Sequence, residues 1–183
     1  MRRFIHSAAF TCLAAIAFGC ASSKAPKSEA QTHAPAREAG STNVCTLQSH
    51  GRDVLRVTVP PNATCTAEEG TIRIESREHD VVDLWLVPGA KSVDEGIGRV
   101  GTLIAYQFKG LRVATTAPLT VSGAPAKRLT GTGVETDDGD PGSADLIVFK
   151  MGDDVFVACT HGESITAAAR QQMLTVVQSA KAH

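Results

Sequence analysis

The chain has 183 residues, of which 43% are hydrophobic and 20% charged, and its formal net charge is −1 at pH 7. These values describe an ordinary soluble domain and leave room for one such domain. They argue against a nucleic-acid partner, because binding to phosphates needs a concentrated basic surface. Aromatic residues make up 4% of the chain, so the core must be built largely from Val, Leu, Ile and Ala.

The first 20 residues have the layout of a secretory signal. Arg2 and Arg3 precede a mostly apolar run, residues 4–18, which is too short to span a bilayer as a stable helix. Gly19 and Cys20 follow, and this arrangement resembles the signal of bacterial lipoproteins, which is cut before the cysteine. The resemblance implies that residues 1–19 are removed and that Cys20 carries acyl chains, which would attach the protein to a membrane. The alternative is an ordinary cut after Ala15-Ile16-Ala17.

Residues 20–43 are predicted to form a lipidated flexible tether. After Cys20 this segment is rich in Ala, Ser, Pro and scattered charge, and it has no Leu, Ile, Val or aromatic residue to bury. A coil of this length reaches about 25 Å on average. Ala21, in place of Asp, resembles lipoproteins that are sent to the outer membrane, so the expected location is the outer membrane, facing the periplasm.

From residue 44 the pattern changes to strands, and we expect residues 44–183 to form one globular domain. Residues 44–47 and 54–59 flank a Gly-containing turn at 50–53, which indicates a hairpin with one buried face. Residues 71–76 and 81–87 form a second predicted hairpin. Residues 84–87 are apolar at every position, which is typical of a central strand covered on both faces.

A helix is predicted from 92 to 109. Ser92 and Glu95 fit a capping box, apolar residues recur at helical spacing up to Phe108, and Lys109-Gly110 would end the helix. Three glycines, Gly96, Gly98 and Gly101, weaken this helix, which indicates that something packs tightly against it.

Strands return in the second half of the chain, and a closing helix follows. The predicted strands are 111–115, 119–122, 126–135, 144–150 and 155–160. The helix is predicted from 164 to 181, with Thr160 and Glu163 as a second capping box. Strands of this kind with two helices make an α+β domain.

The order of these elements resembles the PsbP-like superfamily over residues 54–181. The resemblance rests on Val57-Thr58-Val59-Pro60-Pro61, the helix at 92–109, Val121-Ser122-Gly123-Ala124-Pro125-Ala126, Val155-Phe156-Val157-Ala158-Cys159 and the terminal helix. A cystatin-like sheet would share several of these features. The resemblance implies an antiparallel sheet of about six to eight strands with two main helices packed on it. It also implies a binding or assembly module without catalytic residues or cofactor.

Three cysteines remain after Cys12 leaves with the signal and Cys20 is lipidated: Cys45, Cys65 and Cys159. In an oxidising compartment they allow one disulfide and one leftover thiol. Cys45 with Cys65 is the favoured pair because both flank the first hairpin. The alternative is Cys159 paired with either one. No C-x-x-C motif is present, which argues against redox catalysis.

Other polar groups have a structural interpretation beside a chemical one. Asp137, Asp138, Asp140 and Asp145 indicate a solvated acidic loop, with a calcium site as the alternative. His161, Glu163 and Ser164 indicate helix capping rather than a hydrolytic set, since no G-x-S-x-G motif surrounds a serine. His50, His79 and His161 favour solvated turns, because a zinc site would need the fold to gather them.

Two further sets complete the candidates. Trp85, the only tryptophan, is predicted to lie in the core. Lys109, Arg112, Lys127 and Arg128 could form a modest basic edge, although a solvated strand face is the default interpretation.

The sequence therefore predicts a non-enzymatic, membrane-anchored envelope lipoprotein that acts as a protein-binding or assembly module. The expected partners are the membrane, through the lipid, and another envelope protein. The alternative is a small-ligand binder that uses a groove between sheet and helix near glycines 96–101. A hydrolase is the third interpretation, and no metal is predicted.

Overall fold

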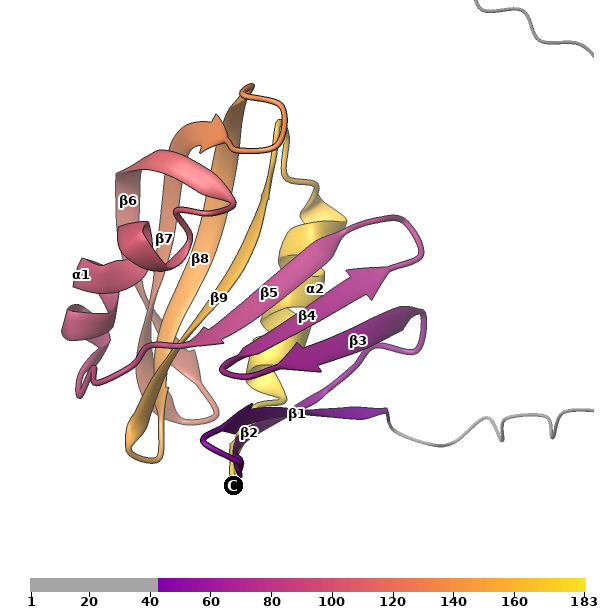
Figure 1. The fold of residues 1–183 in the computed structure, drawn as a ribbon, viewed down its shortest axis with the longest axis vertical. Helices are drawn as coiled ribbons and strands as arrows, with labels where there is room; N and C mark the ends of the chain where they lie inside the picture. Colours follow the sequence, from indigo (N-terminus) through magenta and orange to yellow (C-terminus); the bar gives the residue numbers. More distant parts are fainter. Residues whose placement is uncertain (1–42) are drawn as a thin grey trace, which may run out of the picture. The chain divides into compact units, whose positions relative to one another are not determined.

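A computed structural model describes residues 43–183, and Figure 1 shows their arrangement. The elements in chain order are β1 (Val44–Ser49), β2 (Arg52–Thr58), β3 (Ala63–Glu68), β4 (Thr71–Ser76), β5 (Val81–Leu86), α1 (Val93–Leu103), β6 (Phe108–Val121), β7 (Ala124–Glu135), β8 (Pro141–Met151), β9 (Asp154–Gly162), α2 (Ala167–Gln178) and β10 (Lys181–Ala182). The predicted signal, residues 1–19, and nearly all of the predicted tether, including Cys20, lie outside the described residues.

The strands form two antiparallel sheets. The larger has seven strands in the order β3-β4-β5-β9-β8-β7-β6, and the smaller has three in the order β1-β2-β10. The predicted α+β class with an antiparallel sheet and two main helices is confirmed. The two predicted hairpins are also present, but the first belongs to the smaller sheet.

The two helices lie on opposite faces of the seven-stranded sheet (Figure 1). Alternate residues of the middle strands therefore supply two separate cores. Leu84 and Phe156 belong to the core under α2, whereas Trp85 and Val157 belong to the core under α1. Because β5 is covered on both sides, residues 84–87 can be apolar at every position, as the sequence predicted.

Helix α1 begins as predicted but ends earlier. The Ser92 hydroxyl caps it by accepting a hydrogen bond from the Glu95 backbone N–H. The helix ends at Leu103, so its predicted extension to 109 is wrong. Ile104 is the C-cap, and Phe108 is the first residue of β6. Both side chains are buried in the core under α1, and they are four residues apart. Their spacing therefore resembles the apolar spacing of a helix that continues.

The glycines of α1 have different roles. A Cβ added at Gly96 would lie 2.7 Å from Val155 Cγ1 and 2.9 Å from Val148 Cγ1, so the helix touches the sheet at this point. Nothing lies within 4 Å of a Cβ added at Gly98 or Gly101. The predicted tight packing is therefore right for Gly96 alone. The three pockets described in this structure are lined by residues other than 96–101, where the ligand groove was predicted.

The remaining corrections concern the ends of elements. Strand β3 was not predicted. Two predicted strands on either side of Pro118 are one strand, β6. The closing helix begins at Ala167 rather than 164, because Thr166 caps it by accepting from the Ala169 N–H, whereas Thr160 lies buried in β9. The chain leaves this helix at Gln178, and β10 then pairs with β2.

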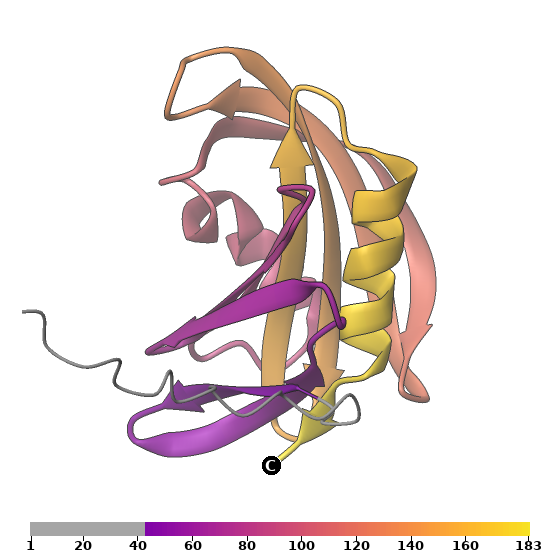
Figure 2. The ribbon, with the colours of Figure 1, turned by 90° about the vertical axis from the view of Figure 1, so that its right-hand side faces the viewer.

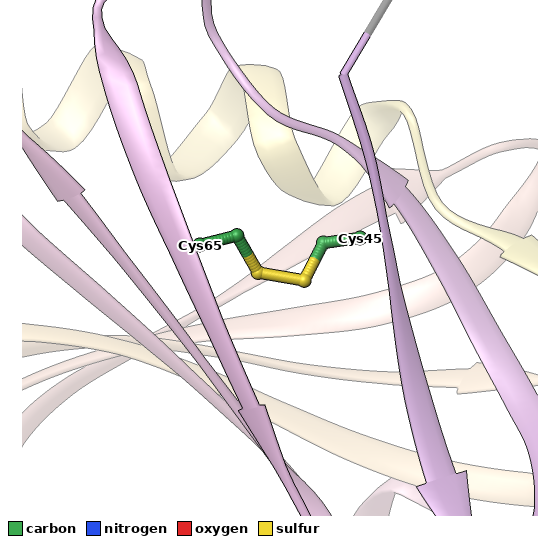
Figure 3. Close-up of a disulfide and its surroundings, with 2 residues drawn as sticks. All are labelled: Cys45 and Cys65. Atoms are coloured by element: carbon green, nitrogen blue, oxygen red, sulfur yellow. A yellow bond between two sulfur atoms is a disulfide. The ribbon is translucent and has the colours of Figure 1, made fainter.

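A disulfide joins the two sheets. Cys45 lies on β1 and Cys65 on β3, and their Cα atoms are 6.4 Å apart (Figure 3). This is the pairing that the sequence favoured. Closing a loop of this length stabilises the fold by about 3 kcal/mol. Cys159 is a free thiol, buried in β9.

Candidate functional site

The seven-stranded sheet extends beyond α2 on one side. Helix α2 packs on β9, β5 and β2, and from Lys109 to Thr120 every residue of β6 is exposed or half-buried. Figure 2 shows the lower part of β6 at the margin of the sheet, beside α2. On β7, every second residue from Arg128 to Val134 faces the same side of the sheet as α2, although α2 itself lies over other strands. These residues are Arg128, Thr130, Thr132 and Val134. We call the α2-side surface of these strands the outer face; it comprises Arg112, Thr115, Arg128, Thr130, Thr132 and Val134.

Register and side-chain contacts place these residues on one side of the sheet. Thr130 is paired with Thr115 on β6 and with Asp145 on β8, and the hydroxyls of Thr115 and Thr130 are 2.6 Å apart. Asp145 in turn contacts Arg170 of α2. The outer face is therefore continuous with the surface on which α2 lies.

An ion triad stands where the outer face meets α2. The Arg128 guanidinium donates to both carboxylate oxygens of Asp145, with Nε 2.8 Å from Oδ1, and the Nε of Arg170 is 3.3 Å from Oδ2. Asp145 is 1% exposed, while the Arg128 and Arg170 side chains are 32% and 46% exposed. Two cations share one buried anion, so the triad carries a net charge of +1. The hydrogen bond to Asp145 raises the pKa of Arg128, which stays charged.

This triad corrects the predicted acidic loop. Asp145 faces inward from β8 and is paired, so it does not belong with the solvated side chains of Asp137, Asp138 and Asp140. Within residues 43–183 no group of three His, Cys, Asp or Glu side chains is placed to hold a metal ion.

A shallow groove of about 560 Å³ crosses the other end of the outer face. It is lined by Lys109 and Arg112 from β6, by Thr132 and Val134 from β7, and by Ser143 of β8 and Glu163 beyond β9, among others. Lys109 and Arg112 form no ion pair with residues 43–183. An exposed apolar side chain adjoins them, since Val134, which is 40% exposed, lines the same groove. The predicted basic edge thus divides: Lys127 pairs with Asp94 on the α1 side, whereas Arg128 pairs with Asp145.

The free edge of β6 is poorly suited to adding another strand. Two register shifts interrupt its pairing with β7, one between Lys109 and Arg112 and one between Val113 and Thr115. Gly110 in the first irregularity has φ +63°, a conformation that favours glycine. Pro118 lies further along the strand and has no N–H to offer. The face of β6 and β7, and not their edge, is therefore the open surface.

A second candidate site is a pocket of about 200 Å³ where β5 and β9 separate. Their antiparallel pairing ends at Asp83 and Cys159, so the residues that precede Asp83 and those that follow Cys159 diverge. The pocket is lined by Arg73, His79, Asp80, Thr160, His161 and Ser164, among others. The fold therefore brings together two of the three histidines that the sequence placed apart. His50 lies in the β1–β2 turn.

Beside this pocket lies a buried carboxylate, Asp83, which is 2% exposed. Gln107 Nε2 donates to its Oδ2 over 2.9 Å, and the guanidinium of Arg73 is 3.7 Å away. Burial is the largest influence on this group and raises the pKa of Asp83. Trp85, buried as predicted, donates from Nε1 to the hydroxyl of Tyr106 over 2.8 Å. These two hydrogen bonds hold the segment between α1 and β6 over the sheet.

His161 faces a carboxylate rather than a serine. Its Nδ1 is 3.6 Å from Oε1 of Glu135, and neither atom has a hydrogen-bond partner although both are buried. His161 is part of β9 and Ser164 follows that strand, so these residues do not cap α2 as predicted. Within residues 43–183 no serine hydroxyl hydrogen bonds to an imidazole. Burial also raises the pKa of the Cys159 thiol strongly, which keeps it protonated and a poor nucleophile.

None of the helices in the described part of the chain has the length and apolar character needed to cross a membrane.

Comparison with known proteins identifies a fold and no family. No family model matches the chain, and no curated protein matches it. Among solved structures, a protein from Bacteroides thetaiotaomicron VPI-5482 matches with a TM-score of 0.51 and 9% identity over 70% of this chain. This chain spans 45% of the length of that protein.

Two other solved structures match over more of their own length. The PsbP of Synechocystis sp. PCC 6803 matches with a TM-score of 0.48 and 12% identity, over 82% of this chain and 99% of that one. LpqN, involved in cell envelope biogenesis of Mycobacterium tuberculosis, matches with a TM-score of 0.45 and 13% identity, over 76% of this chain and 90% of that one. A PsbP thus stands among the structural matches. At these identities the likeness concerns the fold alone.

Proposed function

We propose that this protein is a non-enzymatic lipoprotein of the bacterial cell envelope that binds another envelope protein through its outer face. The outer face carries the proposal. It is a sheet surface that α2 leaves uncovered, with an exposed valine, Val134, beside Lys109 and Arg112, which form no ion pair with residues 43–183. Apolar side chains among cations are a combination found at protein interfaces. The membrane attachment rests on the signal and on Cys20.

The interface is tested by site-specific photo-crosslinking in cells. The photoreactive residue p-benzoylphenylalanine replaces Thr132 on the outer face, and in a matched chain it replaces Thr66, an exposed threonine of β3 at the opposite margin of the sheet. We expect an adduct with one envelope protein from position 132 and none from position 66. The purified partner must then bind the native chain and bind a Thr132→Arg chain less tightly. Equal adducts at both positions, or none at position 132, would contradict the proposal.

The anchor is tested by mass spectrometry of the mature protein and by cell fractionation. We expect a chain that begins at Cys20 with acyl mass, and loss of a Cys20→Ser chain from the membrane fraction. A native chain that starts at Phe18 without lipid would show that the ordinary cut is used.

A second candidate function is binding of a small polar ligand in the pocket between β5 and β9. One observation favours it: His161 Nδ1 and Glu135 Oε1 are buried without hydrogen-bond partners, and His161 lines that pocket. Buried polar atoms left without partners are costly, and a ligand in this pocket that hydrogen bonds to the imidazole of His161 would satisfy Nδ1. Calorimetric titration with small polar compounds, compared between the native chain and a His161→Phe chain, distinguishes this function from the first.

A further inference from the structure

We infer that the segment of the partner that docks on the outer face is acidic. This inference rests on the proposed function and names the chemistry of the partner. It follows from the distribution of charge over the face, which differs from that of the whole chain: the chain has a net charge of −1, but the outer face and its rim carry an excess of cations.

The charges can be followed along the face. Lys109 and Arg112 line the groove at one end without ion-pair partners among residues 43–183, and Glu163 is the one anion among the groove residues. At the other end the triad of Arg128, Asp145 and Arg170 adds a net charge of +1. Lys109, Arg112 and Glu163 of the groove together with the triad therefore have a net charge of about +2, with the one carboxylate of the triad withdrawn from solvent.

Hydrogen-bonding capacity also remains at the triad. A guanidinium has five N–H donors, and the hydrogen bonds to Asp145 use two from Arg128, while Arg170 contacts Asp145 as an ion pair. Both side chains are partly exposed, so donors are left for an acceptor from outside. Carboxylates are the protein groups whose geometry matches a guanidinium best.

The spacing fits an extended segment. Arg128 and Val134 lie six residues apart on one strand, which corresponds to about 20 Å. A segment of roughly six to eight residues could therefore place carboxylates at both ends of the face and small or apolar side chains between them, over Thr130, Thr132 and Val134.

The probe is a fluorescent octaglutamate peptide, titrated against the full lipidated chain in detergent micelles and followed by anisotropy. We expect saturable binding that weakens with added salt. Lys109→Glu and Arg112→Glu should each lower the affinity about fivefold, and the double variant about twentyfold. Arg77→Glu is the matched control, since it makes the same change of charge in the exposed β4–β5 turn and should leave the affinity unchanged. Arg128 is left intact because its reversal would leave Asp145 buried without its partner.

Three results would overturn the inference. One is absence of octaglutamate binding. Another is equal weakening by Arg77→Glu, which would reduce the effect to overall charge. The third concerns a Thr132→Cys chain that carries an environment-sensitive dye: a blue shift in vesicles with phosphatidylglycerol but not in pure phosphatidylcholine would mean that the face contacts anionic lipid.

The crosslinking experiment separates this inference from the proposed function. If the adduct at position 132 still forms in the Lys109→Glu, Arg112→Glu double variant and octaglutamate does not bind, the partner-binding function stands and the acidic segment is wrong. If no adduct forms at position 132 in the native chain, both the partner-binding function and the acidic segment are wrong.

Discussion

The middle strands and the outer strands of the same sheet have opposite surroundings. In β9 the residues from Val155 to Thr160 are all buried, with Phe156 facing the α2 core and Val157 the α1 core. In β6 the residues from Lys109 to Thr120 are exposed or half-buried throughout. Both strands lie in one continuous hydrogen-bonded sheet, yet β9 contributes core on two faces and β6 leaves most of its length to solvent.

The difference shows that the middle strands supply most of the buried apolar surface, whereas the outer strands leave a surface open to solvent. The hydrophobic contribution of β5, β8 and β9 stabilises the fold, because their side chains are removed from water on both sides. The outer strands contribute fewer core residues, such as Phe108 and Leu129, and the turn between them contacts α2 through a hydrogen bond from Ser122 Oγ to the Gln178 carbonyl oxygen. Their surface residues can therefore change with little cost to folding.

The largest effect expected from this comparison is on core packing. Phe156→Ala removes a fully buried ring that stacks on Phe149, with ring centroids 5.6 Å apart, and should lower the free energy of unfolding by about 3–5 kcal/mol. Val113→Ala on β6 should lower it by less than about 0.5 kcal/mol. Urea denaturation measures both. Similar losses in the two variants would mean that the outer strands are as important to stability as the middle ones.

A smaller effect separates two glycines of one helix. Gly96→Ala places a Cβ against Val148 and Val155, and this overpacking, partly offset by better helix propensity, should cost about 1–2 kcal/mol. Gly98→Ala has open space around it and should stabilise the protein by about 0.5–1 kcal/mol. Thermal denaturation of the two variants under the same conditions is the measurement. If both variants are more stable than the native chain, α1 does not touch β8 and β9 as closely as described.

The smallest effect concerns the carboxylate buried in a middle strand. Burial raises the folded-state pKa of Asp83 above its ordinary value of 3.8, so the folded protein holds this proton more tightly than the unfolded chain does. The contribution of Asp83 to stability is therefore lost as the pH rises from about 3.8 through the folded-state pKa. Asp83→Asn should remove this decrease in stability with rising pH.

Chemical denaturation between acid and neutral pH measures this effect, with Asp153→Asn, an exposed carboxylate of the β8–β9 turn, as the control. The difference in unfolding free energy between the native and Asp83→Asn chains should decrease with rising pH. An increase would show that Arg73 and Gln107 stabilise the charged form by more than burial destabilises it.

The sequence predicted the elements whose pattern reflects burial. Residues 84–87 are apolar at every position because β5 lies between two cores, and Ser92 begins α1 because its hydroxyl satisfies a free backbone N–H. Strand β3 was missed because Ala63–Glu68 lies at the margin of the sheet and mostly faces solvent, so it carries little apolar signal. Phe108 was assigned to the wrong element because a buried residue after a helix can keep the helical spacing by coincidence.

The outer face was only partly visible in the sequence. Lys109, Arg112 and Arg128 were recognised as a basic edge, but the sequence could not show that Arg128 is paired with a buried Asp145 while the other two have no ion pair in the described part of the chain. Asp145 looked like a member of the acidic loop because it follows Asp140 closely in the chain. Its partner Arg170 belongs to α2, far along the sequence, and only the folded chain brings them together.

The Cys45–Cys65 bond determines how the domain would respond to tension. A pull exerted through the segment before residue 43 enters the domain at Val44, one residue before the bond. The covalent link between β1 and β3 (Figure 3) then transmits the force to the large sheet. The rest of the β1–β2 hairpin bears little of that force. The small sheet is thereby protected from being peeled open strand by strand.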